Sequence, residues 1–298
     1  MKATVLLVLL LLGGSIAAQE SKPTWPPDTW TVAAEVQASF VAGGDLDDAS
    51  GDFDTSIVEP MVRVRGPAWE GALLAFFAGY EYRHYEFDGA QPFFPTLEDP
   101  WEDVHSVNFG VHVLQGLSRN WGVFVGAQGR ASASANASLG DGLSGLFLAG
   151  AGYDFENGFR IGVGVAGLLA FEDEFRIFPA LQFDWRIDDH WRAKLEGLRF
   201  DLTYSPDEEW TFGVGARADG ARFRLPDTPV RDESIVEDRR IATFLSAAWN
   251  VDDSIKLAAE VGVDVYRSIR IEDKFGDNGR SYESGVAPFF GLGLTFTF

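Results

Sequence analysis

Large apolar and small or polar residues alternate one by one along most of this chain. The C-terminal segment shows this most clearly: after Tyr282, bulky apolar side chains fall on even positions and Gly, Ala, Thr or Glu on odd ones. The even set is Val286, Phe290, Leu292, Leu294, Phe296 and Phe298. A period of two residues predicts β-strands with two unlike faces, because successive side chains point to opposite sides.

The same pattern recurs along the chain and predicts an all-β protein of fourteen antiparallel strands. They are expected near 30–41, 54–65, 69–86, 102–117, 121–131, 143–155, 159–171, 174–187, 191–196, 198–205, 210–225, 236–250, 255–271 and 281–298. The segment 191–205 decides the count. As one strand it would give thirteen and place the termini at opposite rims, so a short hairpin bending at Glu196-Gly197 is predicted, where the sheet would dip. Twelve strands are an alternative.

The two faces of these strands favour a closed transmembrane barrel over a soluble sandwich. The polar face is rich in Gly, Ala, Ser and Thr, which suits the crowded interior of a closed sheet. The apolar face carries almost no charge along its middle, as contact with lipid requires. In a sandwich the apolar face would instead form a shared core of interlocking side chains. We therefore expect a transmembrane antiparallel up-and-down β-barrel.

Tight polar turns alternate mostly with longer loops, as in a meander. Ser118-Arg119-Asn120 precedes Trp121, Asp188-Asp189-His190 precedes Trp191, and Asp207-Glu208-Glu209 precedes Trp210. Longer polar stretches lie at 42–53, 88–100, 132–142, 226–237 and 272–281. In bacterial barrels such turns are periplasmic and the loops extracellular. The aromatic residues beside the turns would then form one interfacial belt.

The first residues and the composition limit where the protein acts. Lys2, an apolar run at 5–12 and Ser15-Ile16-Ala17-Ala18 predict a cleaved signal peptide at 1–18, followed by a Pro-rich periplasmic arm at 19–29 and the barrel at 30–298. No later apolar run reaches the ~18 residues of a spanning helix. The absence of Cys excludes disulfides and thiol catalysis, and a net charge of −21 argues against nucleic acid as a partner.

With its leader, Gly-rich strands, and final Gly291-Leu292-Gly293-Leu294-Thr295-Phe296-Thr297-Phe298, the chain resembles bacterial outer-membrane β-barrel proteins. The repeated aromatic turns and the strand at 199–204 are most similar to a family of such barrels without an assigned activity. The resemblance implies residence in the bacterial outer membrane, contact with its lipid, and recognition of the strand ending at Phe298 by the barrel-insertion machinery. By analogy, a monomer is expected, because trimeric porins usually have more strands.

Strand parity places a set of charged side chains on the inner face. The predicted lumen-lining residues are Arg63, Arg65, Arg130, Arg160, Arg176, Arg186, Arg192, Arg199, Arg217, Lys256, Glu260 and Asp264, with Glu35, Glu59 and His112 among others of the same parity. Fourteen strands enclose more space than side chains of an eight-stranded barrel fill. We therefore expect a passive, porin-like channel for small polar solutes, without cofactor, bound metal or catalytic residues. A salt-bridged interior that conducts nothing is the alternative.

Three other functions are compatible with parts of the sequence. A non-conducting barrel could use its acidic loops for structure or adhesion. A hydrolase could gather residues at the outer rim, namely Glu81, His84, Glu102, Asp103 and His105. A soluble secreted β-protein would need neither lipid nor lumen. The acidic segment 45–52 departs from the calcium-loop pattern, since Ala49 and Ser50 occupy its fifth and sixth positions.

Parity also predicts that three arginines near the loops face lipid or the space just beyond it. They are Arg222, Arg224 and Arg267. In that position they could meet lipopolysaccharide phosphates, or lie beyond the membrane. A β-bulge would reverse their orientation.

Overall fold

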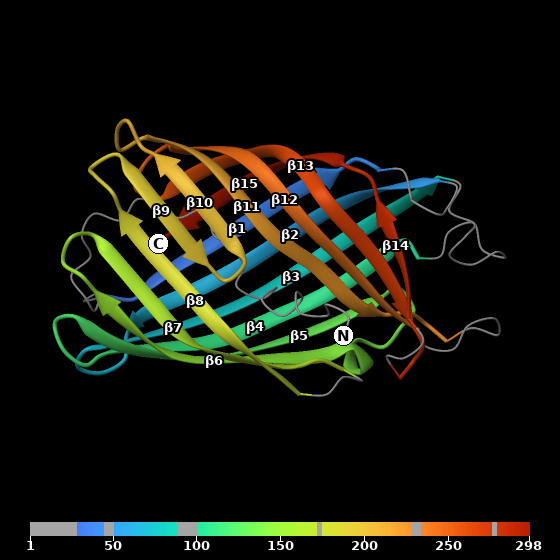
Figure 1. Cartoon of the computed structure of the whole chain (residues 1–298), viewed down its shortest axis with the longest axis horizontal. Coiled ribbons are helices and arrows are strands. Elements are labelled where there is room, and N and C mark those ends of the chain that lie inside the picture. Colours follow the sequence, from blue (N-terminus) through green and yellow to red (C-terminus); the bar gives the residue numbers. More distant parts are fainter. Residues whose placement is uncertain (1–28, 45–50, 89–100, 172–174, 228–233, 276–278) are drawn as a thin grey trace.

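A computed structural model describes residues 29–44, 51–88, 101–171, 175–227, 234–275 and 279–298. The predicted leader, most of the arm, and parts of the acidic loops lie outside them. From β1 to β13 each strand pairs antiparallel with the next strand in the chain, and β15 pairs with both β13 and β1, so the sheet closes into a barrel (Figure 1). The bounds are β1 Thr31–Val41, β2 Asp52–Pro67, β3 Ala72–Asp88, β4 Asp103–Gly116, β5 Trp121–Ser134, β6 Leu143–Asp154, β7 Phe159–Leu169, β8 Arg176–Arg186, β9 Trp191–Glu196, β10 Arg199–Tyr204, β11 Trp210–Arg224, β12 Ile235–Asn250, β13 Ile255–Glu272, β14 Arg280–Ser284 and β15 Ala287–Thr297.

The strand predicted at 281–298 is divided into β14 and β15 by a break at Gly285 and Val286. Both pieces keep one register on β13, because Ser284 pairs with Arg267 and Ala287 pairs with Asp264. Only β15 also pairs with β1. The barrel therefore has fourteen positions around its circumference, which confirms the predicted count and excludes twelve.

The two faces of the wall differ as predicted. Outward side chains in the middle of strands are apolar and exposed, including Val163 (56%), Val261 (59%) and Leu292 (62%). On the inner face of β6 and β7, Gly150 lies opposite Gly164 and Gly152 opposite Gly162. A closed sheet satisfies the backbone within itself, which a strand surrounded by hydrocarbon requires. No helix in the described residues is long and apolar enough to cross a membrane.

The tight turns share one hydrogen-bonding arrangement. The Oδ1 atoms of Asp188, Asp207 and Asp252 each accept backbone N–H bonds from the residues two and three positions later, at 2.7–3.0 Å. An Asp side chain that bonds the backbone ahead of it forms an Asx turn, which reverses the chain in few residues. The repeated Asp at the start of these turns is thereby explained.

One prediction follows for the exposed turn at Asp188. Its bonds from the N–H groups of Trp191 and His190 lower the pKa of this carboxyl. Because the pKa of Asp188 is lower in the folded state, ionised Asp188 stabilises the fold at pH values above its unfolded-state pKa of about 3.9. This stabilisation is lost as the pH falls through the folded-state pKa. Asp188→Asn should therefore flatten the dependence of the urea midpoint on pH in that acidic range. An unchanged slope would contradict it.

Aromatic side chains gather at the tight-turn end. Trp210 stacks on Trp249 with ring centroids 5.8 Å apart, and Trp121 meets Tyr153 edge-on at 5.0 Å. Other pairs there are Phe159 with Trp185 and Trp191 with Tyr204. These rings come from neighbouring strands at one height, as the predicted interfacial belt requires.

The barrel wall is shorter along the barrel axis at the hairpin of β9 and β10 than elsewhere, as the sequence predicted. Each has six residues, and β8 pairs with β9 only from Phe183 onward (Figure 1). On the far side, β11 continues beyond β10 until Arg224 bridges Ala133 of β5 in parallel. The exposed stretch of β8 contains Pro179, a residue without an N–H, as expected at a strand edge.

A β-bulge in β13 reverses the orientation of its upper part. Ile241 pairs with Tyr266 but Ala242 pairs with Asp264, so Val265 is the extra residue. Val265 and Tyr266 are both exposed, and Arg267 is only 2% exposed. The parity prediction that Arg267 faces lipid is therefore wrong, because parity assumes an unbroken period of two.

Arg222 and Arg224 lie on the outward face, as their parity predicts, but both side chains contact other residues of the protein. Their guanidinium groups lie 5.0 and 5.2 Å from the ring centre of Phe171, and Arg224 also donates to the backbone carbonyl of Asp141. Arg222 forms an ion pair with Glu272 at 3.2 Å. Both arginines thus fasten neighbouring segments to the end of β11.

Candidate functional site

The interior has three levels, beginning with an apolar cluster at the loop end. Its buried members are Phe53, Tyr85, Trp101, Val104, Ala221, Phe223, Leu225, Val236, Ile269 and Tyr282. Trp101 packs edge-on against Tyr85, Phe87 and Phe223 with ring centroids 5.1–6.0 Å apart. Among the described residues, this packing links β2, β3 and β4 to β11, β12, β13 and β14 across the barrel.

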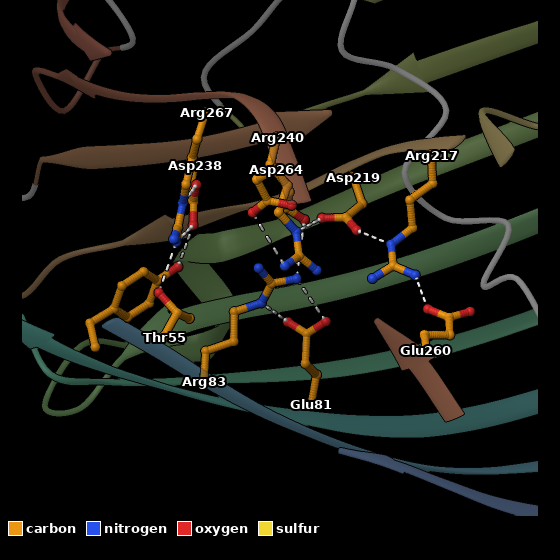
Figure 2. A network of polar contacts seen from close by, with 12 residues as sticks. Thr55, Glu81, Arg83, Arg217, Asp219, Asp238, Arg240, Glu260, Asp264 and Arg267 are labelled. Carbon is orange, nitrogen blue, oxygen red and sulfur yellow. Dashed lines mark hydrogen bonds and ion pairs between the residues drawn. The ribbon is translucent and has the colours of Figure 1, made fainter. Parts of the chain in front are cut away.

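A network of ion pairs crosses the interior at mid-height (Figure 2). Arg83 on β3 donates to both carboxylate oxygens of Glu81, at 2.7 and 3.1 Å, and Arg130 on β5 donates to the same carboxylate at 2.7 Å. Arg83 also reaches the carbonyl oxygen of Gly220 at 3.4 Å. Gly220 lies on the part of β11 that extends beyond its pairing with β10. The guanidinium group of Arg83, from the opposite wall, thus donates a hydrogen bond to a backbone carbonyl on this part of β11.

The β10–β13 side of the network is a chain of alternating charges. Asp219 accepts from Arg217 and Arg240, and Glu260 accepts from Arg217 and Arg199. Arg199 also holds Asp201. Each of these arginines therefore has a carboxylate partner, and the two shared carboxylates each hold two arginines.

A third group lies between the network and the apolar cluster. Arg267 donates to both oxygens of Asp238, at 3.1 and 2.8 Å, and to the hydroxyl of Thr55 at 2.8 Å. The Tyr85 hydroxyl donates to Asp238 at 3.0 Å. Arg267 also lies over the ring of Phe53 at 4.3 Å. The pair fastens β12 and β13 to β2 and β3 across the barrel.

A cavity of about 160 Å³ lies within the mid-height network. Its charged lining residues are Glu59, Glu81, Arg83, Arg130, Arg199, Arg217, Asp219, Arg240 and Glu260. Asn108, Met61 and Leu198 also line it. This cavity, which residues from both sides of the barrel surround, is the candidate functional site. No group of three or more His, Cys, Asp or Glu side chains suited to a metal ion occurs in the part of the chain described.

The predicted lumen residues fall into two groups. Arg130, Arg199, Arg217, Glu260 and Asp264 belong to the mid-height network or border it, Asp264 with both carboxylate oxygens lacking a hydrogen-bond partner among the described residues. The others are spread over the rest of the wall, mostly near the tight-turn end: Arg63, Arg65, Arg160, Arg176, Arg186, Arg192 and Lys256. Of these, Arg192 bonds Asp184, Arg160 bonds Asp154, and Arg63 lies 3.7 Å from Glu35. Arg176 begins β8 at the opposite end.

Sequence reasoning missed the network members Arg83, Asp219, Asp238 and Arg240. Their strands carry aromatic or aliphatic residues on the inner face near the loops, for example Tyr85 and Phe223. The parity rule took the small or polar face as the inner one, so it failed where both faces are apolar. The sequence signal that could have identified these residues is a pair of charged side chains two positions apart within an apolar strand, as in Glu81 and Arg83.

The residues considered for a rim hydrolase do not all come together. Glu81 is buried inside the barrel, which corrects its expected position at the rim. His84 Nδ1 lies 2.9 Å from Asp103, which also accepts from the hydroxyl of Tyr82, and His105 contacts the hydroxyl of Tyr80. His84 therefore contacts an acid and His105 a phenol, and among the described residues no Ser or Thr hydroxyl donates to either imidazole.

The chain belongs to the family of the domain of unknown function DUF6268, whose model matches residues 100–297. No curated protein matches in sequence. A FadL homologue from Pseudomonas aeruginosa is similar over 91% of this chain and 90% of its own, at 10% identity and a TM-score of 0.49. An outer membrane channel from Pseudomonas putida F1 is similar over 94% and 100%, with the same identity and TM-score.

Proposed function

We propose that the protein is an outer-membrane transport barrel through which small polar solutes pass. The observation that carries the proposal is the charged cavity at mid-height in a fourteen-strand barrel. A purely structural interior of this width would be expected to fill with apolar side chains or with ion pairs and no space. The exposed apolar side chains outside support a lipid setting for the wall.

Transport in this proposal requires the network to open. Arg217 and Glu260 are about one-eighth exposed, and their ion pair is part of the chain of charges across the cavity. Ion pairs that exchange partners can move without leaving a charge unpaired. The described state is then the closed form of a channel whose wall supplies alternative carboxylates for each arginine.

A non-conducting barrel is the second candidate, and the apolar cluster at the loop end favours it. Ten buried side chains, among them Trp101 and Phe223, pack together inside the barrel at that level. A solute that travels along the axis would have to displace them. In this alternative the ion pairs brace the opposite walls, and the protein acts through its outer surface.

The remaining expectations concern biogenesis. A cleaved leader, contact with outer-membrane lipid, a monomeric state and recognition of the terminal strand by the insertion machinery are proposed together. Phe298 is 78% exposed, and its backbone exchanges hydrogen bonds with Val32, so its side chain is accessible while its backbone closes the barrel. This accessibility supports a role for Phe298 in recognition.

Conductance of refolded protein in planar bilayers tests the transport proposal. Wild type should give discrete steps, and the double variant Arg217→Gln with Glu260→Gln should open more often. Loss of about 1 kcal/mol from the closed state raises the open population roughly fivefold. Glu196→Gln, which alters a partly exposed ion pair with Lys194 outside the cavity lining, is the matched control and should leave the steps unchanged. Absence of steps from wild type and double variant alike would favour the non-conducting barrel.

A further inference from the structure

Glu59 differs from every other carboxylate that lines the cavity. Glu81, Asp219 and Glu260 each accept from two arginines. Glu59 lines the same cavity but has no hydrogen bond or ion pair with any residue that the structure describes. Glu59 is partly buried, and although Arg83 and Arg130 lie in the same lining, neither donates to it. Its oxygens are therefore available to accept N–H donors from a ligand.

The strand register makes the missing partner more significant. Pairing of Val58 with Tyr82 and of Met61 with Gly79 places Glu59 directly opposite Glu81. Like charges opposite each other on neighbouring strands are destabilising. Around this level the ion pairs and Glu59 together comprise six arginines and seven carboxylates: Arg83, Arg130, Arg199, Arg217, Arg240 and Arg267, against Glu59, Glu81, Asp201, Asp219, Asp238, Glu260 and Asp264. The site therefore has room in its charge balance for one cation.

A second acceptor in the cavity lining also lacks a donor. Asn108 is 6% exposed and lines the cavity, and its Oδ1 has no hydrogen-bond partner among the described atoms. A carboxylate and an amide oxygen without donors suit a group that brings several N–H donors.

We propose that the cavity binds a small organic ammonium ion, with Glu59 as its counter-ion and Asn108 as a hydrogen-bond acceptor. An ammonium group carries three donors and a positive charge. Met61 and Ile57 lie on the same face of β2 and offer apolar surface for the carbon portion. A divalent metal ion is a poorer match, because it takes six or more oxygen ligands. The inference rests on the proposed function and names the solute class that the channel would select.

Equilibrium dialysis of folded protein in detergent micelles against radiolabelled methylammonium tests the proposal. Wild type should bind saturably, about one ion per barrel, and Glu59→Gln should weaken binding at least tenfold, since the charge is removed with little change of shape. Glu59→Asp keeps the charge and should retain binding within a few-fold. Glu196→Gln is the control, because Glu196 faces inward but lies outside the cavity lining. Far-UV circular dichroism and gel mobility before and after boiling verify that each variant is folded.

Two results would overturn the assignment to ammonium. The first is no saturable binding by wild type, or binding that Glu59→Gln leaves unchanged. The second is displacement of methylammonium by potassium chloride at equal concentration, which would make the site a general cation site. Binding is measured without a bilayer, so its failure is distinct from failure of the channel proposal: a barrel that binds but shows no conductance steps would keep this site and lose the pore.

Discussion

Replacing Arg267 by methionine is expected to lower the free energy of unfolding by about 3–5 kcal/mol. Arg267 and Asp238 are 2% and 1% exposed at their side chains and joined by two hydrogen bonds. Removing the guanidinium group leaves the carboxylate of Asp238 buried, with Tyr85 as its one remaining side-chain donor among the described residues. The cost therefore comes mainly from the charge left behind and only partly from the lost contact.

Urea titration of refolded protein, followed by tryptophan fluorescence, measures this loss. The double variant Arg267→Met with Asp238→Leu should recover about half of it or more, because a buried ion pair replaced by apolar side chains is often neutral. Arg186→Met removes an exposed arginine at the tight-turn end and should change the free energy of unfolding by less than about 0.5 kcal/mol. Equal losses in the single and double variants would show that the unpaired charge is not the cause.

Val163→Arg is expected to destabilise the barrel in phospholipid vesicles by about 2–4 kcal/mol. Val163 is 56% exposed in the middle of β7, on the outward face. If hydrocarbon covers this face, the arginine must enter it or distort the lipid around it. If water covers the face, as in a soluble β-protein, an exposed arginine costs almost nothing.

The matched control is Gln182→Arg on the neighbouring strand. Val163 pairs with Leu181, so position 182 lies at nearly the same height, and Gln182 lies opposite Gly162 on the inner face. The inner face already carries ion pairs, and we expect a change below about 1 kcal/mol there. Equal effects of the two substitutions in vesicles would contradict a lipid-covered wall.

The hairpin of β9 and β10 combines a feature that the sequence predicted with a long-range contact that it did not predict. The turn at Glu196-Gly197 and the shortness of both strands could be predicted, because they depend on neighbouring residues. The bridge between Arg224 and Ala133 could not, since these residues are far apart in the chain and belong to strands that are not neighbours in the meander. The wall is closed above the hairpin by tertiary packing alone.

The candidate site divides in the same way. Arg199, Arg217 and Glu260 could be assigned to the inner face, because the alternation of their strands is unbroken as far as these residues. Arg267 could not, since one extra residue at Val265 inverts the faces beyond it. Which carboxylate each arginine selects depends on distances across the barrel, and alternation along a strand carries no information about the opposite wall.

By itself the sequence determined the strand count, the tight turns, the aromatic belt and the apolar outer face. Each of these follows from a period of two residues or from a turn a few residues long, so local chemistry is sufficient. The tertiary structure alone decided that aromatic side chains pack together at the loop end, that ion pairs cross the middle, and that Glu59 has no hydrogen-bond or ion-pair partner among the described residues. Those features depend on which inner faces meet when the sheet closes, and closure joins residues separated by most of the chain.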